Sequence, residues 1–369
     1  MKKLTNMAYN LIYIDDEIGK RDAFADSLTD NSDLEIKSYS PSNLGETRDL
    51  IFSNQELDGV ILDLKLDGVK YEENTADYTA PSLATAIRSK IVENNFKNEF
   101  PIFLLTSQDN LEKYYKYDLT SHDLFDFLFF KQKLGEVNNY PQKIISILDA
   151  YKTIKEEGKK MNSILKVDLS GLINVNLPSK FYDSDSASVY DISKFVLKKI
   201  VLRQGILISE EVLAARLGVD IEASQDWEQL KVFFKHIKYD GIYSQVWNRW
   251  WSHKLVSYWR EVFPKSPPLI SLNATERVEI IKKQYNLPEL KPATPIEKAS
   301  GSKFWTVCKV YNKPLDVRDG ILIEMLDSEP WHDKMYISLE SILERDYKGK
   351  KISIHPSEID RVNDLKEGY

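Results

Sequence analysis

Val60-Ile61-Leu62-Asp63 is a short apolar run that ends on a carboxylate, and its pattern recurs through the first half of the chain. A run that is apolar at every position is typical of a strand buried on both faces of a parallel sheet. Three similar runs and one alternating run lie around it, at Leu11–Ile14, Pro101–Leu105, Phe125–Phe130 and Leu34–Tyr39. The sequence therefore predicts five strands in this half.

Segments with helical spacing separate these strands. Apolar residues recur at intervals of three or four in residues 21–28, 44–52, 82–92, 111–117 and 141–154. Alternating strands and helices predict an α/β domain with a five-stranded, doubly wound parallel sheet. Ligands of such sheets bind at the edge where the strands end, so the residues that follow each strand are candidates for function.

Four of the five predicted strands are followed by side chains that can do chemistry. The first strand is followed by Asp15, Asp16 and Glu17, the third by Asp63, the fourth by Thr106 and Ser107, and the fifth by Lys131. Crowded carboxylates raise one another's pKa unless a cation neutralises them, and hard oxygen ligands suit Mg²⁺. A hydroxyl and an ammonium group at the same edge would hold an anion against the metal. We therefore expect a site for Mg²⁺ and an anion at this edge.

In this order and on these strands, the side chains resemble the site of the receiver domain of two-component response regulators, over about residues 8–155. The resemblance implies a flavodoxin-like fold in which Asp63 is the phosphoacceptor. It also implies that Asp15, Asp16 and Asp63 bind Mg²⁺, together with the backbone carbonyl of Lys65.

The same resemblance implies a reaction and its partners. A histidine kinase or phosphotransfer protein would supply the phosphoryl group that Asp63 accepts. Thr106 would donate a hydrogen bond to that group, and Lys131 would pair with its oxygens. The resemblance also allows a homodimer formed through the receiver. The expected protein is a bacterial-type response regulator of a phosphorelay that signals to a C-terminal effector or partner-binding domain.

Two residues depart from the family pattern. Gln132 follows Lys131 where receivers usually have proline, and Leu128 stands where a switch aromatic is common. These departures motivate an alternative hypothesis, a receiver without a switch that acts as a phosphate sink or a docking module. A bacterial phage-defence system is one setting for such a protein.

The composition bounds the class of protein. The chain has 369 residues, of which 42% are hydrophobic and 29% charged, and this suits two or three folded domains. The net charge is -7, and residues 1–160 hold 20 Lys and Arg against 28 Asp and Glu, so the acidity belongs to the first half. A chain of this charge has no overall attraction for nucleic acid or anionic lipid.

Cysteine and hydropathy indicate the compartment. Cys308 is the single cysteine, so no disulfide can form within the chain, and one thiol with five scattered histidines cannot build a Cys/His zinc cage. No window approaches 18 consecutive apolar residues, which argues against a membrane span. We therefore expect a cytoplasmic protein with no membrane partner.

The second half differs in character from the first. All seven tryptophans lie between Trp227 and Trp331, and from about residue 303 the pattern changes from helices to short strands. We expect four regions along the chain: a receiver over 1–155, a linker helix or hinge over 156–165, a helical Trp-rich domain over 166–298 and a small α+β subdomain over 299–369.

Residues 246–262 are predicted to form an amphipathic helix with an aromatic stripe. Packing in a core is one interpretation of this segment. The other is a ligand platform for a nucleotide, nucleic acid or peptide, built from Trp250, Arg249 and Lys254 outside the main stripe. The residues alone do not choose among these ligands.

The second half carries a segment that resembles a DNA-binding motif but no catalytic motif. Residues 208–219 resemble the start of a helix-turn-helix, but Asp220, Glu222 and Asp226 would then face DNA phosphates, so we expect no sequence-specific DNA binding. No catalytic motif appears, so enzymatic activity beyond autophosphatase-type chemistry at the phosphoacceptor stays an open question. This half resembles C-terminal parts of receiver-like proteins from bacterial defence operons, with no motif to quote for that resemblance.

Overall fold

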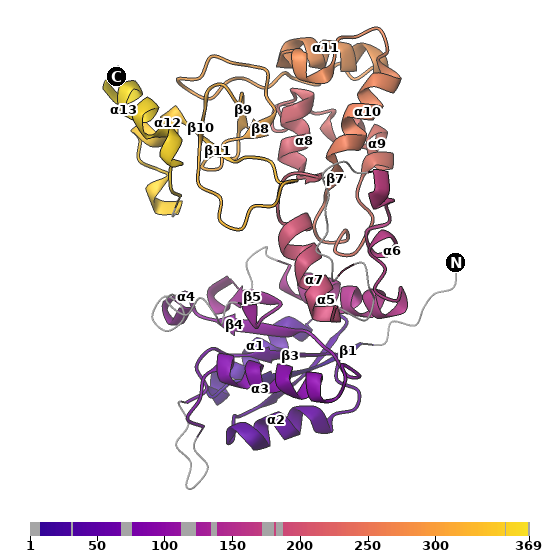
Figure 1. The fold of residues 1–369 in the computed structure, drawn as a ribbon, viewed down its shortest axis with the longest axis vertical. Coiled ribbons are helices and arrows are strands. Elements are labelled where there is room, and N and C mark those ends of the chain that lie inside the picture. Colours follow the sequence, from indigo (N-terminus) through magenta and orange to yellow (C-terminus); the bar gives the residue numbers. More distant parts are fainter. Residues whose placement is uncertain are drawn as a thin grey trace. The chain divides into compact units, whose positions relative to one another are not determined.

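The computed structural model describes residues 8–30, 32–67, 76–111, 123–133, 139–171, 181, 187–350 and 352–367. They fold into two compact units (Figure 1). The first unit takes its described residues from the ranges 1–167, 177–197 and 241–246, and the second from the ranges 168–176, 198–240 and 247–369.

The described residues of the first unit build a sheet of five parallel strands in the order β2-β1-β3-β4-β5. The strands are β1 (Tyr9–Ile14), β2 (Leu34–Tyr39), β3 (Gly59–Leu62), β4 (Ile102–Thr106) and β5 (Phe127–Phe130). The five predicted strands and the doubly wound parallel sheet are confirmed. Five parallel strands in this order with flanking helices form a flavodoxin-like fold.

Helices cover both faces of this sheet (Figure 1). They are α1 (Ile18–Thr29), α2 (Leu44–Ser53), α3 (Ala80–Glu93), α4 (Gln108–Asn110) and α5 (Tyr140–Glu156). Val60 and Leu104 pack with Ile87 of α3 on one face, whereas Phe129 packs against the ring of Tyr140 of α5 on the other. The strands are apolar throughout because each buries side chains on both faces.

Local signals explain where the helices begin. The side chain of Asn43 accepts the N–H of Glu46 at 2.9 Å and caps α2, and prolines stand in the first turns of α3 and α5. The helix predicted over residues 111–117 lies outside the described residues, apart from its first position.

Two further helices extend the first unit beyond the predicted boundary at residue 155. They are α6 (Met161–Leu165) and α7 (Val189–Phe195), and α7 packs against α5. The Glu99 carboxylate accepts the N–H groups of Val189 at 2.9 Å and Tyr190 at 2.7 Å. An acidic group at a helix N-terminus satisfies unpaired N–H groups and the helix dipole, so Glu99 holds α7 on this unit.

The second unit contains short antiparallel strand pairs among helices. Its helices are α8 (Glu210–Leu217), α9 (Trp227–Phe233), α10 (Ser252–Val262), α11 (Ala274–Tyr285), α12 (Leu339–Leu343) and α13 (Ile359–Glu367). The paired strands are β6 (Leu207–Ile208) with β7 (Trp250–Trp251), β8 (Thr306–Val307) with β9 (Pro314–Leu315), and β10 (Gly320–Leu322) with β11 (Tyr336–Ser338).

The tryptophans of this unit mainly build its core. Trp227, Trp250 and Trp259 lie in one buried cluster, and Trp251 beside them has no exposed surface. The helix predicted over residues 246–262 begins only at Ser252, because Trp250 and Trp251 pair with β6 as a strand, a conformation that suits aromatic residues.

Two buried arginines join the helical and α+β parts of the second unit. Arg277 of α11 donates to the carbonyls of Phe304 at 2.7 Å and Arg216 at 3.0 Å. Arg216 in turn donates to the Trp305 carbonyl at 3.1 Å and pairs with Asp333 at 2.6 Å. Residues on both sides of the predicted boundary at 298 therefore belong to one unit.

In the described part of the chain, no helix combines the length and the apolar character that a membrane span requires.

Candidate functional site

The carboxyl ends of β1, β3 and β5 place four charged residues at one edge of the sheet. Asp15 and Asp16 follow β1, Asp63 follows β3, and Lys131 follows β5. The three aspartates each offer one carboxylate oxygen, and these oxygens lie within 4.8 Å of one another. Asp16, Asp63 and Lys131 line a cavity of about 590 Å³. The residues predicted from separate strand ends thus lie together.

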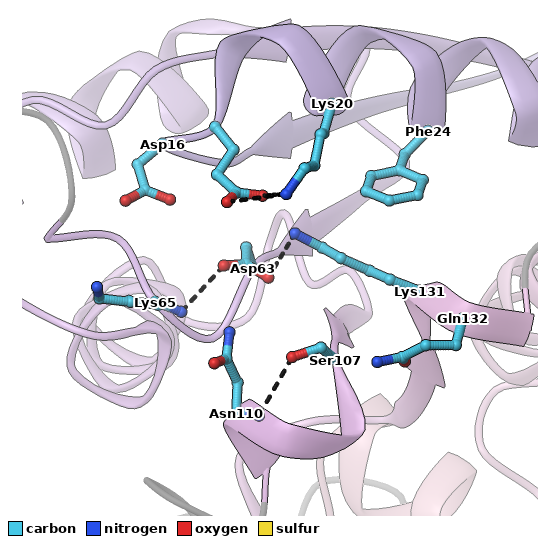
Figure 2. A pocket seen from close by; sticks show the side chains of 10 residues that line it. Asp16, Lys20, Phe24, Asp63, Lys65, Ser107, Asn110, Lys131 and Gln132 are labelled. Atoms are coloured by element: carbon cyan, nitrogen blue, oxygen red, sulfur yellow. Dashed lines mark hydrogen bonds and ion pairs between the residues drawn. The ribbon is translucent and has the colours of Figure 1, made fainter.

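Lys131 bridges two of the carboxylates. Its Nζ lies 2.7 Å from Asp15 Oδ2 and 2.8 Å from Asp63 Oδ1. Figure 2 shows Asp63 between this ammonium group and the backbone of Lys65, whose N–H donates to Asp63 Oδ2 at 3.1 Å. Each oxygen of Asp63 therefore faces a positively polarised group.

Asp15 is fully buried, and donors reach both of its oxygens. Oδ1 accepts the backbone N–H of Glu17 at 2.8 Å, and Oδ2 accepts the Tyr13 hydroxyl in addition to the Lys131 ammonium. A buried carboxylate destabilises a fold unless it is paired and hydrogen-bonded. These three donors therefore make the burial of Asp15 tolerable.

Burial and neighbouring charges set the ionisation of the site. Burial raises the pKa of Asp63 to about 6; Lys131 lowers this pKa, and the charge of Asp15 raises it. Burial by itself lowers the pKa of Lys131, but the charges of Asp63 and Asp15 outweigh it, and the net change is upward. The lysine therefore stays protonated in the pH range where Asp63 titrates.

The raised pKa of Asp63 predicts a pH dependence of stability in metal-free protein. Because the folded-state pKa is about 6 and the ordinary value 3.8, folding favours the protonated carboxyl. The contribution of Asp63 to the free energy of unfolding is therefore full below the ordinary pKa and is lost as pH rises through the folded-state value. Two pKa units correspond to a loss of about 3 kcal/mol.

We expect Asp63→Asn, which cannot titrate, to lack this loss. Chemical unfolding of both proteins in EDTA, at several values between about pH 4 and about pH 7, measures the difference between the two pH profiles. Parallel pH profiles of the two proteins would contradict the raised pKa.

The carboxylate cluster fits a hard divalent cation. Its three ligating side chains offer only carboxylate oxygens, the ligand type that Mg²⁺ prefers. Lys131 gives them one positive charge, whereas two other lysines at the cavity pair with acids outside the cluster, Lys20 with Glu17 at 3.2 Å and Lys65 with Asp67 at 3.9 Å. Asp15 and Asp63 share the single positive charge of Lys131, so this pair keeps negative charge that a dication would neutralise.

Thr106, predicted to contact an anion, is the last residue of β4 and is fully buried. Among the described residues, its hydroxyl oxygen has no hydrogen-bond partner. A buried hydroxyl without a partner is uncommon, because it loses its hydrogen bonds to water without replacement. Thr106 therefore keeps a donor that a ligand at this edge would satisfy.

Six more side chains line the cavity. Two of them, Glu17 and Ser107, follow predicted strands, and the others are Lys20, Phe24, Asn110 and Gln132. Figure 2 shows Ser107 and Asn110 together, where Ser107 Oγ accepts the N–H of Asn110 at 3.1 Å. Gln132 Oε1 accepts the N–H of Gln108 at 3.3 Å and so links the loops after β4 and β5. Position after a strand indicates Ser107 in the sequence, whereas Lys20 and Phe24 lie within α1, where the sequence gives no such signal.

The predicted ligand platform of the second unit is wrong for Trp250. This side chain is 3% exposed and lies in the core, because β7 turns it inward. Arg249 Nε donates to the carbonyl of Val201 at 2.6 Å, and Lys254 lies with its Nζ 5.5 Å from the centre of the Trp251 ring. The core interpretation therefore accounts for the aromatic part of this segment.

Comparisons with known proteins match only part of the chain. No family model and no curated protein match it. An adenylate cyclase structure from Rhodopirellula baltica is 12% identical with a TM-score of 0.30, and the match covers 42% of this chain and 99% of that one. A LuxR-family DNA-binding response regulator from Staphylococcus aureus is 18% identical with a TM-score of 0.28, covering 38% and 98%. A LuxR-family two-component response regulator from Aurantimonas sp. SI85-9A1 is 14% identical with a TM-score of 0.27, covering 39% and 84%.

Proposed function

We propose that the first unit is a receiver whose Asp63 accepts a phosphoryl group from a phosphohistidine of a histidine kinase or phosphotransfer protein. One observation carries this proposal. The Asp63 carboxylate is buried beside a cavity at the carboxyl edge of a parallel sheet, 2.8 Å from the Lys131 ammonium and within reach of two further carboxylates. Such an edge is where open α/β sheets bind ligands, and such a cluster suits phosphoryl transfer.

The proposed step is a displacement at phosphorus. An oxygen of ionised Asp63 forms a bond to phosphorus while the P–N bond of the phosphohistidine breaks, and the imidazole leaves with the electron pair and takes up a proton. Lys131 pairs with oxygens of the transferred group, because its Nζ already lies beside Asp63 Oδ1. The buried hydroxyl of Thr106 donates to the same group.

We assign the metal site to Asp15, Asp16, Asp63 and the backbone carbonyl of Lys65. When bound there, Mg²⁺ neutralises negative charge on the transferring phosphoryl group. The protein's own part is to hold these oxygens close together before the metal binds, and the Lys131 ammonium limits the repulsion among them.

Incubation with Mg²⁺ and acetyl phosphate, followed by intact-mass measurement, tests the proposal. Wild-type protein is expected to gain the mass of one phosphoryl group, and the gain is expected to disappear with EDTA. Asp63→Asn is expected to show no gain, because an amide oxygen is a far weaker nucleophile than a carboxylate. No gain on wild type, or an equal gain on Asp63→Asn, would refute the assignment.

A second candidate is a receiver without a switch, used as a phosphate sink or docking module. The bond from Gln108 N–H to Gln132 Oε1 favours it, because this bond ties the loops after β4 and β5 together. Leu128 is packed against the core that includes β3 and α3, in place of a mobile aromatic. Hydrogen exchange with and without a beryllofluoride phosphoryl mimic separates the candidates. A second unit whose exchange never responds would favour the sink, and a responsive one would favour the switch.

A further inference from the structure

A buried tyrosine stands behind the carboxylate cluster. Tyr13 lies on β1, two residues before Asp15, which directly follows the strand. Its hydroxyl donates to Asp15 Oδ2, the oxygen that also accepts Lys131 Nζ at 2.7 Å. The same Nζ lies 2.8 Å from Asp63 Oδ1. The contacts therefore run without a break from Tyr13 through Asp15 and Lys131 to the proposed phosphoacceptor.

The hydroxyl is placed for polar contact and adds nothing to the packing of the ring. Tyr13 has no exposed surface, so a phenylalanine would fill the same space without a polar group to satisfy. The hydroxyl of Tyr13 faces Asp15 Oδ2, and a neutral phenol donates its proton to a carboxylate oxygen. A group that can donate only toward the cluster restrains how the Asp15 carboxylate turns.

The restraint has a consequence for the whole site. Asp15 is fixed by three donors, the Tyr13 hydroxyl, the Glu17 N–H and the Lys131 ammonium. Without the hydroxyl, Oδ2 is held by Lys131 alone, and that lysine also serves Asp63. A turn of Asp15 would then carry the ammonium group away from Asp63 and disperse the oxygens of the cluster.

We propose that Tyr13 is a positioning residue that acts through Asp15 to preorganise the divalent-cation and phosphoryl site. This inference rests on the proposed function for its phosphoryl part and on the carboxylate cluster for its metal part. Groups that orient metal ligands through hydrogen bonds typically change metal affinity by about 10-fold to 100-fold when removed. Tyr13 belongs to that class of group.

The test compares Tyr13→Phe with Tyr78→Phe in the full chain. Tyr78 is a buried tyrosine of the same unit, but its hydroxyl donates to Thr47 Oγ1 at 2.8 Å, outside the cluster. Isothermal titration with Mg²⁺ alone is expected to give a Kd at least about 10-fold weaker for Tyr13→Phe and unchanged for Tyr78→Phe. Thermal unfolding in EDTA controls for structural loss, which both variants share.

A double-mutant cycle with Asp15→Asn tests whether Tyr13 affects Mg²⁺ binding through Asp15. If Tyr13 acts through Asp15, adding Tyr13→Phe to Asp15→Asn weakens Mg²⁺ binding no further. Full additivity of the two changes, an unchanged or tighter Kd for Tyr13→Phe, or equal weakening in Tyr78→Phe would each overturn the inference. So would a wild-type chain that binds no Mg²⁺.

Acetyl phosphate labelling separates this inference from the proposed function. A wild-type chain that binds Mg²⁺ but gains no phosphoryl group would remove the proposed function, and the Mg²⁺ affinities would still decide the role of Tyr13. A wild-type chain that gains the phosphoryl group while Tyr13→Phe matches it in Kd and in labelling rate would remove only the role of Tyr13.

Discussion

Replacing Lys131 with methionine is expected to lower the free energy of unfolding of the metal-free first unit by about 3–5 kcal/mol. Lys131 is the cation that bridges Asp15 and Asp63, whose side chains are 0% and 4% exposed. Its removal leaves two buried carboxylates close together without the positive charge that compensates them. Removing one partner of a buried ion pair is far more damaging than removing a surface partner, because water cannot replace it.

Lys20→Met is the matched control for this prediction. Lys20 lines the same cavity, but its side chain is 68% exposed and pairs with Glu17 at 3.2 Å. We expect a change of less than about 1 kcal/mol, since exposed pairs contribute little. Chemical unfolding in EDTA, monitored by hydrogen exchange of peptides from the first unit, measures the free energy of unfolding of both variants.

Added Mg²⁺ is expected to stabilise Lys131→Met more than wild type. A cation that binds only the folded state reduces the repulsion between Asp15 and Asp63, which the variant no longer offsets with an ammonium group. The same variant is expected to lose most acetyl phosphate labelling, since no ammonium group then meets the phosphoryl oxygens. Stability equal to that of Lys20→Met would show that Lys131 does not compensate the cluster.

The sequence predicts the site best where a functional residue directly follows a buried strand. Val60–Leu62 reads as a buried strand, and the next residue, Asp63, must lie at the carboxyl edge where ligands bind. The same reasoning located Asp15 and Lys131. Because parallel strands end at one edge, strand prediction alone was enough to bring these residues together.

The contact of Tyr13 with Asp15 could not be predicted from the sequence. Tyr13 lies within the apolar run of β1, where a tyrosine is indistinguishable from any other core residue. Only the side-chain direction shows that its hydroxyl reaches Asp15. Trp250 failed in the opposite sense, because helical spacing suggested an outward face, whereas pairing with Ile208 in a distant strand turned the ring into the core.

Helix α7 belongs to the first unit, and its attachments there are remote in sequence. Glu99 and the α7 residues that it caps lie 90 and 91 positions apart. No local pattern in the sequence encodes such a bond. The helical spacing of the sequence ends at residue 154, so the predicted boundary of the first domain lies at residue 155, before α7. The attachment also rests on Arg88, whose guanidinium lies 3.9 Å from the centre of the Tyr190 ring.

Replacing Arg88 with methionine is therefore expected to lower the free energy of unfolding of the first unit by about 3–5 kcal/mol. Arg88 Nη2 donates to Asp126 Oδ2 at 2.7 Å, and the Asp126 side chain is only 1% exposed. Methionine fills the space but leaves Asp126 charged without a cation. The Tyr151 hydroxyl at 2.6 Å and the Ile102 N–H at 2.8 Å still bond it, but neither carries a positive charge.

Arg48→Met is the control, because Arg48 pairs with Asp49 at 2.8 Å on the surface of α2. We expect it to change stability by less than about 1 kcal/mol. Adding Asp126→Asn to Arg88→Met is expected to recover part of the loss, since a neutral amide no longer needs a cation.

We expect the loss of stability in Arg88→Met to appear first as local opening of α7. This helix contacts Arg88 through Tyr190, and its other N-terminal bonds are made by Glu99. Amide exchange of residues 189–195 should therefore accelerate in Arg88→Met under conditions where β3 stays protected. Exchange that rises equally in α7 and β3 would show that Arg88 stabilises the sheet as a whole. A stability loss no larger than that of Arg48→Met would contradict the buried charge pair itself.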